Sequence, residues 1–253
     1  MLGIIGGSGL TQMSDLQDIR RKVVRTPFGD PSGALNLGRI NGHEVVFLAR
    51  HGHGHTIPPH EVNYRANLWA LHSQGVKDVL SIATVGGIHA DLTPGTIAIP
   101  DQIIDYTWGR KTTYHDCSAA MCGSKSVVHI DFTWPYCEDM RQLCIKACQG
   151  AGEKYIDSGV YAAVQGPRLE TAAEINRLER DGATMVGMTG MPEASLAREI
   201  GLCYAALTVS ANHAAGRGSS KDAIPYEEVE AVLNVAMRRV FGVIEHLVAL
   251  RAD

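Results

Sequence analysis

The sequence predicts an α/β fold, a single domain of three layers in which helices cover both faces of a central mixed, mostly parallel sheet. Short apolar runs typical of buried strands alternate along the chain with segments of helical periodicity. The 253 residues, 45% of them hydrophobic, suffice for one sizeable core, and no linker or repeat divides residues 1–253. An Asn-Gly pair between two strand-like runs predicts an antiparallel hairpin at the sheet edge.

Charge and apolar runs exclude several classes of protein. The net charge is −4 and no basic run is present, which argues against nucleic acid as a partner. No apolar run approaches ~20 residues, so no transmembrane helix is predicted, and the start of the chain lacks the basic region of a signal peptide. A cytoplasmic protein without a membrane partner is expected.

The cysteines contain no C-x-x-C pair, which favours reduced, mostly buried thiols. A disulfide among the first five of them stays open as an alternative. The six residues are Cys117, Cys122, Cys137, Cys144, Cys148 and Cys203.

The first ten residues predict a strand that delivers a tight loop. An apolar run at 2–5 is followed by Gly6, Gly7, Ser8 and Gly9. Glycines let backbone N–H groups approach an anion closely, and a serine adds a hydroxyl donor, so the loop is expected to hold phosphate. The dinucleotide fingerprint fails at Gln12 and no P-loop lysine follows, so an ordinary glycine turn is the alternative.

The remaining elements follow in order. Residues 15–25 are polar and are expected to form a surface connection, and residues 35–40 and 44–48 form the hairpin around Asn41-Gly42. Residues 106–135 are irregular, and a stretch of this length is usually functional or covered by a partner. Residues 211–214 are expected to leave the last strand. Further strands are predicted at 79–84, 96–104, 159–164, 184–188 and 202–210, and helices at 63–73, 135–150, 171–179, 192–200 and 227–250.

Polar residues lie where the predicted strands end. In α/β sheets, ligands bind beyond the carboxyl ends of the strands, so these side chains are expected to share one site. Arg50 suits phosphate because its guanidinium donates paired hydrogen bonds, although a structural ion pair would also explain it. The strand-end residues are Ser8, Arg50, Thr84, Met188, Thr189 and Asn212.

Several of these residues have a second interpretation. Alternate histidines at His51, His53 and His55 would suit zinc, but no second cluster of ligands accompanies them. Asn212 could form an Asx turn, and Met188 could belong to the core.

Five motifs resemble the trimeric purine nucleoside phosphorylase and methylthioadenosine phosphorylase family. They are GIIGGSG at 3–9, LARHG at 48–52, VNYRAN at 62–67, QGPR at 165–168 and GMTGMPE at 187–193. The resemblance covers nearly the whole chain and implies the nucleoside phosphorylase fold. It also implies phosphorolysis, in which inorganic phosphate attacks the anomeric carbon of a nucleoside and releases the purine.

The resemblance implies a role for each matching residue. Phosphate, a co-substrate, would be held by Ser8, Arg50, His51, Thr84 and Thr189. The nucleoside would contact Gly86, Gln165, Leu169, Met188 and Asn212. His129 would reach the 5′ pocket of a neighbouring subunit in a homotrimer. His51 and Asn212 are the expected catalytic residues, and no metal, cofactor or nucleophilic side chain is required.

The chain departs from the methylthioadenosine branch at two positions. That branch carries aspartates where this sequence has Asn212 and Ala214. A carboxylate only accepts hydrogen bonds, which suits the amino group of adenine, whereas an amide also donates, which suits a 6-oxopurine such as hypoxanthine. Ile224 and Val229 could form an apolar 5′ pocket, so a 5′-methylthio nucleoside of hypoxanthine is the expected substrate.

Four alternatives remain open at this point. The base could be adenine, or the 5′ group could be the hydroxyl of inosine or guanosine. A zinc hydrolase using the histidines, or a nucleoside-binding protein without turnover, would be a different class of function.

Overall fold

The computed structural model describes residues 1–8, 10, 16–116, 127–224 and 226–251. Its helices are α1 (Tyr64–Ser73), α2 (Glu138–Gly150), α3 (Ala172–Arg180), α4 (Gly190–Glu199), the 3₁₀ helix η1 (Gly218–Ser220) and α5 (Tyr226–Leu250). Its strands are β1 (Leu2–Gly6), β2 (Gln17–Lys22), β3 (Leu35–Ile40), β4 (His43–Ala49), β5 (Asp78–Gly87), β6 (Ile97–Ala98), β7 (Gln102–Asp105), β8 (Tyr155–Ile156), β9 (Val160–Ala163), β10 (Met185–Gly187) and β11 (Cys203–His213).

All described strands join one mixed sheet, which confirms the predicted fold class. The order along its main path is β2-β3-β4-β1-β5-β10-β9-β7, and β11, β6 and β8 branch from β5. The central pairings β4-β1, β1-β5, β5-β11 and β10-β9 are parallel. The predicted hairpin joins β3 to β4 in antiparallel register, and Asn41 and Gly42 take positive φ angles of 48° and 83° in its turn.

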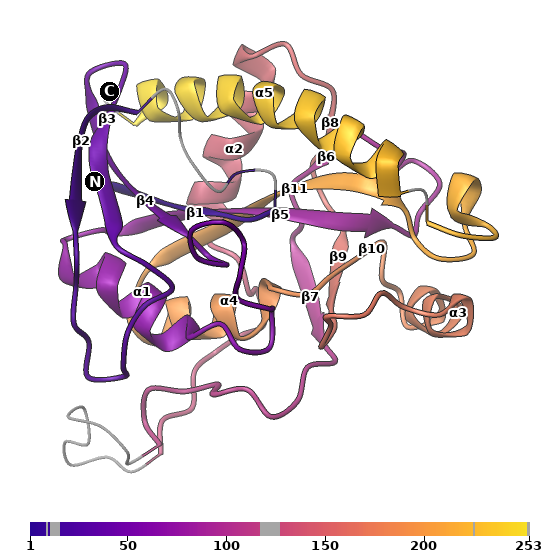
Figure 1. The fold of residues 1–253 in the computed structure, drawn as a ribbon, viewed down its shortest axis with the longest axis horizontal. Coiled ribbons are helices and arrows are strands. Elements are labelled where there is room, and N and C mark those ends of the chain that lie inside the picture. The colour runs from indigo at the N-terminus through magenta and orange to yellow at the C-terminus, as the bar shows by residue number, and fades with distance from the viewer. Residues whose placement is uncertain (9, 11–15, 117–126, 225, 252–253) are drawn as a thin grey trace.

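Helices cover both faces of the sheet, as Figure 1 shows. The face under α2 and α5 buries Ile4 against residues such as Val240, whereas the opposite face, under α1 and α4, buries Ile5 with Leu68 and Leu196. Neighbouring residues of a strand point to opposite faces, so β1 contributes to both halves of the core. Among the described residues, no helix has the length and apolar character needed to cross a membrane.

Strand β5 changes partner along its length, and this change opens the sheet. Its first half pairs with β1 through Asp78 to Ser81, and its last two residues, Gly86 and Gly87, pair with β10. Strand β11 follows it on the other side throughout. The sheet therefore splits between the end of β1 and the end of the antiparallel β10, which creates room for a ligand at the carboxyl ends of the central strands.

Two predicted segments differ in the structure. Part of the expected surface connection at 15–25 forms β2, an exposed edge strand whose charged residues Arg20, Arg21 and Lys22 pair with β3. Such charge is typical of edge strands, and residues 11–15 lie outside the described part. The single strand expected at 96–104 is broken at Pro100 into β6 and β7, which pair with different neighbours.

Strand β11 runs further than the sequence predicted. Ala211, Asn212 and His213 stay in the strand, after a register shift between Ser210 and Asn212. A bulge of this kind redirects the side chains that follow it. The expectation that 211–214 leave the strand is therefore wrong for its first three residues, because Ala211 forms the bulge and Asn212 and His213 again pair with the glycine-rich end of β5.

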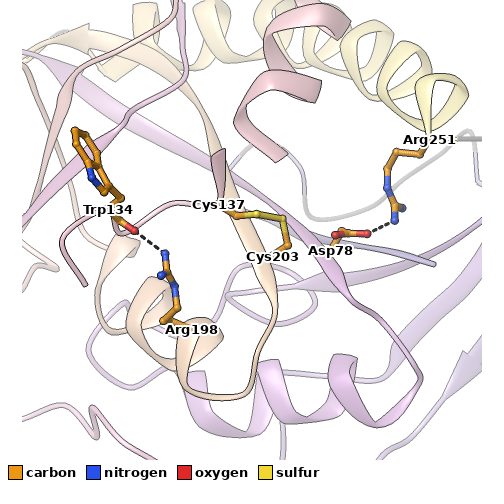
Figure 2. Close-up of a disulfide and its surroundings, with 6 residues drawn as sticks. All are labelled: Asp78, Trp134, Cys137, Arg198, Cys203 and Arg251. Atoms are coloured by element: carbon orange, nitrogen blue, oxygen red, sulfur yellow. Dashed lines mark hydrogen bonds and ion pairs between the residues drawn. A yellow bond between two sulfur atoms is a disulfide. The ribbon is translucent and has the colours of Figure 1, made fainter. Parts of the chain in front are cut away.

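The expectation of reduced cysteines is also wrong for two of them. Cys137, just before α2, forms a disulfide with Cys203, the first residue of β11 (Figure 2). The Cys137 N–H donates to the carbonyl of Tyr204, which holds the two chain segments together. The disulfide that the sequence left open was limited to the first five cysteines and did not include Cys203, because nothing in the sequence brings positions 137 and 203 together. Cys144 and Cys148 are free and buried, and Cys117 and Cys122 lie outside the described residues.

Candidate active site

A cavity of about 540 Å³ opens where the sheet splits. The loop after β1, the ends of β5, β10 and β11, the loop after β4 and the first turns of α5 line it. Most of the predicted site residues are brought together here: Ser8, Arg50, His51, Thr84, Gly86, Leu169, Met188, Thr189, Asn212, Ile224 and Val229.

Two predicted site residues do not line this cavity. The Gln165 side-chain oxygen accepts from the backbone N–H of Trp108 and from Nε of Arg110, both at 3.2 Å, so the side chain lies in a neighbouring cavity. Beyond the turn at Gly166, which has φ of 63°, Leu169 and Glu170 line the cavity, and the contact of Gln165 with the base stays a prediction. His129 is exposed and is absent from the cavity lining.

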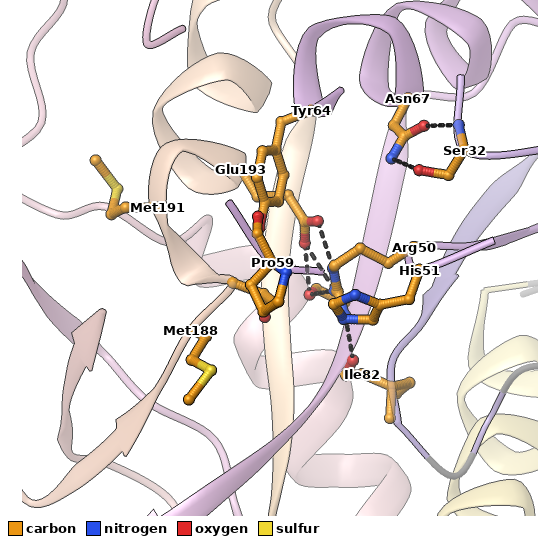
Figure 3. A network of polar contacts seen from close by, with 12 residues as sticks. Ser32, Arg50, His51, Pro59, Tyr64, Asn67, Ile82, Met188, Met191 and Glu193 are labelled. Carbon is orange, nitrogen blue, oxygen red and sulfur yellow. Dashed lines mark hydrogen bonds and ion pairs between the residues drawn. The ribbon is translucent and has the colours of Figure 1, made fainter. Parts of the chain in front are cut away.

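Arg50 is fully buried in an ion pair with Glu193, as Figure 3 shows. Its Nε and Nη2 donate to the two carboxylate oxygens of Glu193 at 2.7 and 2.9 Å. Nη2 also donates to Ser81 Oγ at 2.7 Å, and Nη1 donates to the Ile82 carbonyl at 3.0 Å. Burial lowers the pKa of Arg50, but the Glu193 carboxylate outweighs it, so the guanidinium stays charged.

These contacts use four of the five N–H donors that an arginine carries. The fifth, on Nη1, is available at the cavity that Arg50 lines. A side chain on Gly7 would come within 3.0 Å of Nη1, so the glycine keeps this approach open. The structural ion pair that was the alternative for Arg50 is therefore present and still leaves one donor for an anion.

Glu193 is a residue whose role the sequence did not reveal. Its Oε1 also accepts hydrogen bonds from Ser81 Oγ and Tyr204 Oη, both at 2.8 Å. The carboxylate therefore fixes the direction of Arg50 and is itself held by two buried hydroxyls. It lay inside one of the quoted motifs, but nothing in the sequence pairs it with an arginine 143 residues away.

His51 is neutral and presents a lone pair. Its Nδ1 lies 2.8 Å from the Ile57 carbonyl, which can only accept, so the proton is on Nδ1 and Nε2 is an acceptor. Burial and the positive charge of Arg50 lower the pKa of His51 to about 4. In the cavity, His51 can therefore accept a hydrogen bond from a protonated phosphate oxygen or a hydroxyl.

The lowered pKa of His51 predicts a loss of stability in mild acid. An unfolded imidazole takes up a proton near pH 6.5, whereas the folded one does so only near pH 4. Between pH 6.5 and 5, we expect the free energy of unfolding to fall by about 1 kcal/mol more for the wild type than for His51→Gln. Urea unfolding at several pH values measures this, and equal falls for the two proteins would contradict the buried neutral imidazole.

The two other histidines of the predicted cluster are placed differently from His51. His55 lies with its ring centroid 4.4 Å from that of His51, and its Nε2 is 3.4 Å from Ser8 Oγ, while His53 is exposed. Within the described residues, no three His, Cys, Asp or Glu side chains are grouped as metal ligands. His55 therefore belongs to the polar wall of the cavity beside the glycine loop.

The floor of the cavity comes from the segment after β10. Thr189 is buried, and its backbone N–H donates to Tyr161 Oη at 3.3 Å. Met188 is half-buried and lines the cavity, so it is not an ordinary core residue. A side chain at Gly166 would come within 2.4 Å of the Met188 sulfur, so this glycine lets the two loops meet.

Polar groups at the far end of the cavity can recognise a heterocycle. One N–H of the Asn212 amide donates to the His213 carbonyl at 2.6 Å, which leaves its second N–H and its oxygen for a ligand and is not an Asx turn. Glu170, which the sequence analysis did not single out, also lines the cavity, and burial raises the pKa of its carboxyl. The remaining wall is apolar and comes from Ile224, Val229 and Leu233.

Comparisons with known proteins agree with this geometry. The sequence profile of the Phosphorylase superfamily matches residues 1–249. The chain is 48% identical over 94% of both chains to a probable S-methyl-5′-thioinosine phosphorylase from Pseudomonas syringae pv. tomato. It is 46% identical to a probable 6-oxopurine nucleoside phosphorylase from Thermococcus kodakarensis, over 87% of this chain and 82% of that one. A methylthioadenosine phosphorylase from Schistosoma mansoni in complex with adenine superposes with a TM-score of 0.91 at 33% identity, over 99% of this chain and 91% of that one.

Proposed function

This chain belongs to the phosphorylase superfamily, and on that premise we propose that it catalyses phosphorolysis of S-methyl-5′-thioinosine. The products are hypoxanthine and 5-methylthioribose 1-phosphate. One observation carries the proposal. A single cavity is lined by the anion donors around Arg50, by the Asn212 amide and by apolar side chains, which are the three kinds of group that phosphate, purine and a methylthio group require.

The reaction exchanges one bond of the anomeric carbon for another. The bond from that carbon to the purine nitrogen breaks, its electron pair goes to the purine, and a phosphate oxygen forms the new bond. The fifth N–H of Arg50, the hydroxyls of Ser8, Thr84 and Thr189, and backbone N–H groups of the glycine loop hold the anion. His51 accepts a hydrogen bond through Nε2 from a protonated oxygen of the phosphate. Holding phosphate against the sugar supplies proximity, and no side chain forms a covalent intermediate.

The purine is selected by its hydrogen-bonding pattern. A 6-oxopurine carries an N1–H donor and a C6 carbonyl, whereas adenine carries an N1 acceptor and an amino group. An ionised Glu170 accepts from N1–H, and the free N–H of Asn212 donates to the N7 and O6 edge of the base. With adenine, the carboxylate would face a lone pair, and an unmet polar group costs about 1–3 kcal/mol.

The 5′ group is selected by apolar contact. Ile224, Val229 and Leu233 offer a methylthio group a surface that a hydroxyl cannot use. Discrimination of this kind is modest, about 1–3 kcal/mol, so inosine or guanosine remains the second substrate class. The name of the Thermococcus relative favours that second class.

A homotrimer belongs to the proposal. His129 lies in a segment whose Val127 and Trp134 side chains are 67% and 63% exposed, which suits a surface covered by a second copy. In that arrangement, His129 would complete the 5′ end of a neighbouring cavity. The proposal places the enzyme in the cytoplasm, with phosphate as co-substrate and without a resident cofactor.

The requirement for phosphate tests the reaction class. With S-methyl-5′-thioinosine, we expect release of hypoxanthine only when phosphate is present, with one sugar 1-phosphate formed for each base. Base release without phosphate, abolished by a chelator, would instead indicate a zinc hydrolase. Tight nucleoside binding without base release would indicate a binding protein.

A further inference from the structure

Arg110 lies in the irregular segment between β7 and α2 and donates hydrogen bonds to several cavity-forming loops. Its Nη1 donates to the carbonyls of Met188 and Met191 at 2.8 and 2.6 Å. Its Nη2 donates to the carbonyl of Gln165 at 2.9 Å, and its Nε donates to the side-chain oxygen of the same residue at 3.2 Å. One guanidinium therefore joins the loop after β9 to the loop after β10.

A third loop reaches the same side chain through Tyr64. Nη1 of Arg110 donates to Tyr64 Oη at 3.3 Å, and the guanidinium lies 5.5 Å from the centroid of the Tyr64 ring. Tyr64 Oη in turn donates to the Pro59 carbonyl at 2.9 Å. Pro59 lies in the loop between β4 and α1 that carries His51 and His55, and Figure 3 shows it beside Tyr64.

These three loops supply much of the cavity wall. The loop after β4 contributes His51 and residues up to Pro59, the loop after β9 contributes Leu169 and Glu170, and the loop after β10 contributes Met188 and Thr189. They come from distant parts of the sequence, and no named strand or helix contains all of them. Arg110 is bonded directly to the loops after β9 and β10 and, through Tyr64, to the loop after β4, so this one side chain links all three.

Arg110 has no donor left for a ligand. A sixth contact, from Nη2 to the Val164 carbonyl at 3.3 Å, completes a set in which Nε, Nη1 and Nη2 all have protein acceptors. Arg110 is also absent from the cavity lining, in contrast to Arg50, which lines it and keeps one free N–H. Any effect of Arg110 on the reaction must act through the loops.

We propose that Arg110 is a positioning residue that fixes the base-binding and the sugar- and phosphate-binding loops relative to each other, an inference that rests on the proposed function. Lysine cannot replace it, because an ammonium has three donors and no planar fork. Displacement of reacting groups by about 1 Å can lower a rate by about 100-fold. The loss should appear mainly in kcat, because every group that binds substrate is still present and only the relative positions of these groups change.

The test compares Arg110→Lys and Arg110→Ala with the wild type in phosphorolysis of S-methyl-5′-thioinosine. We expect kcat to fall about 10- to 100-fold in Arg110→Lys, with KM changed much less, and further in Arg110→Ala. Added guanidinium ion should raise the kcat of Arg110→Ala at least about fivefold, because it supplies the planar donors that the missing side chain carried.

Arg141→Lys is the matched control. Arg141 is buried and also donates to two backbone carbonyls, those of Pro100 and Asp157, but it lies on α2 outside the cavity lining. The Arg141→Lys variant should unfold at a lower urea concentration than the wild type, and its kcat should change by no more than about twofold. An unchanged kcat in Arg110→Lys, or equal losses of kcat in both lysine variants, would overturn the role of Arg110. Absence of base release by the wild type would overturn the proposed function and this role with it.

Discussion

Replacing Arg50 by lysine is expected to lower kcat/KM for phosphate by about 100- to 1000-fold, the range found when one preorganised anion donor is removed. Four donors of Arg50 hold it against Glu193, Ser81 and Ile82, and the fifth, on Nη1, is left for an anion in the cavity that Arg50 lines. An ammonium cannot make the paired contact to Glu193 and keep a donor in the same direction. Initial rates at varied phosphate and saturating nucleoside measure the effect.

Arg239→Lys controls for the loss of an arginine–carboxylate pair. Arg239 donates through Nε and Nη2 to Glu153 and through Nη1 to the Gly95 carbonyl, and it does not line the cavity. Both variants should unfold at lower urea concentration than the wild type, and only Arg50→Lys should show the large fall in kcat/KM for phosphate. If Arg50→Lys kept kcat/KM within about threefold while losing stability, Arg50 would be purely structural.

Replacing Asn212 by aspartate is expected to reverse the choice of base. The aspartate cannot donate to the C6 carbonyl of hypoxanthine, but it can accept from the amino group of adenine. Leaving a polar group without a partner costs about 1–3 kcal/mol, which corresponds to about a ten- to a hundredfold change in rate. We therefore expect kcat/KM to fall by that factor for S-methyl-5′-thioinosine and to rise for S-methyl-5′-thioadenosine. Parallel assays of both nucleosides give the ratio directly.

Asn176→Asp is the matched substitution away from the cavity. Asn176 lies on α3 and accepts from Arg217 through its side-chain oxygen, a contact that an aspartate retains. The ratio of kcat/KM for the two nucleosides in Asn176→Asp should equal that of the wild type. A ratio in Asn212→Asp that also stays at the wild-type value would show that position 212 does not read the base.

Local patterns in the sequence were enough for most of the secondary structure. Asn41-Gly42 predicted the hairpin because both positions need positive φ. The helix expected from 171 begins where Thr171 and Glu174 form a reciprocal capping box. Besides β2 and the end of β11, the failures include 97–98 and 155–156, where β6 and β8 have two residues each, because such short strands are defined by their neighbours.

The site was predicted in its residue types and less well in its geometry. Residues at strand ends, such as Thr84 and Asn212, reach the cavity because parallel strands end at the same edge. Gln165 lies outside the cavity lining because the direction of a turn residue depends on its partners, here Arg110 and Trp108. Glu193, Arg110 and the Cys137–Cys203 disulfide depend on contacts between distant segments, which no local pattern encodes.

The most direct test is a side-by-side assay of S-methyl-5′-thioinosine, S-methyl-5′-thioadenosine and inosine, each with phosphate, in which free base is separated and quantified. We expect kcat/KM for S-methyl-5′-thioinosine to exceed both others by about tenfold or more, the effect of one unmet polar group or one apolar contact. Preference for S-methyl-5′-thioadenosine would contradict base selection by Asn212 and Glu170. Preference for inosine would leave that selection intact and contradict the apolar 5′ pocket.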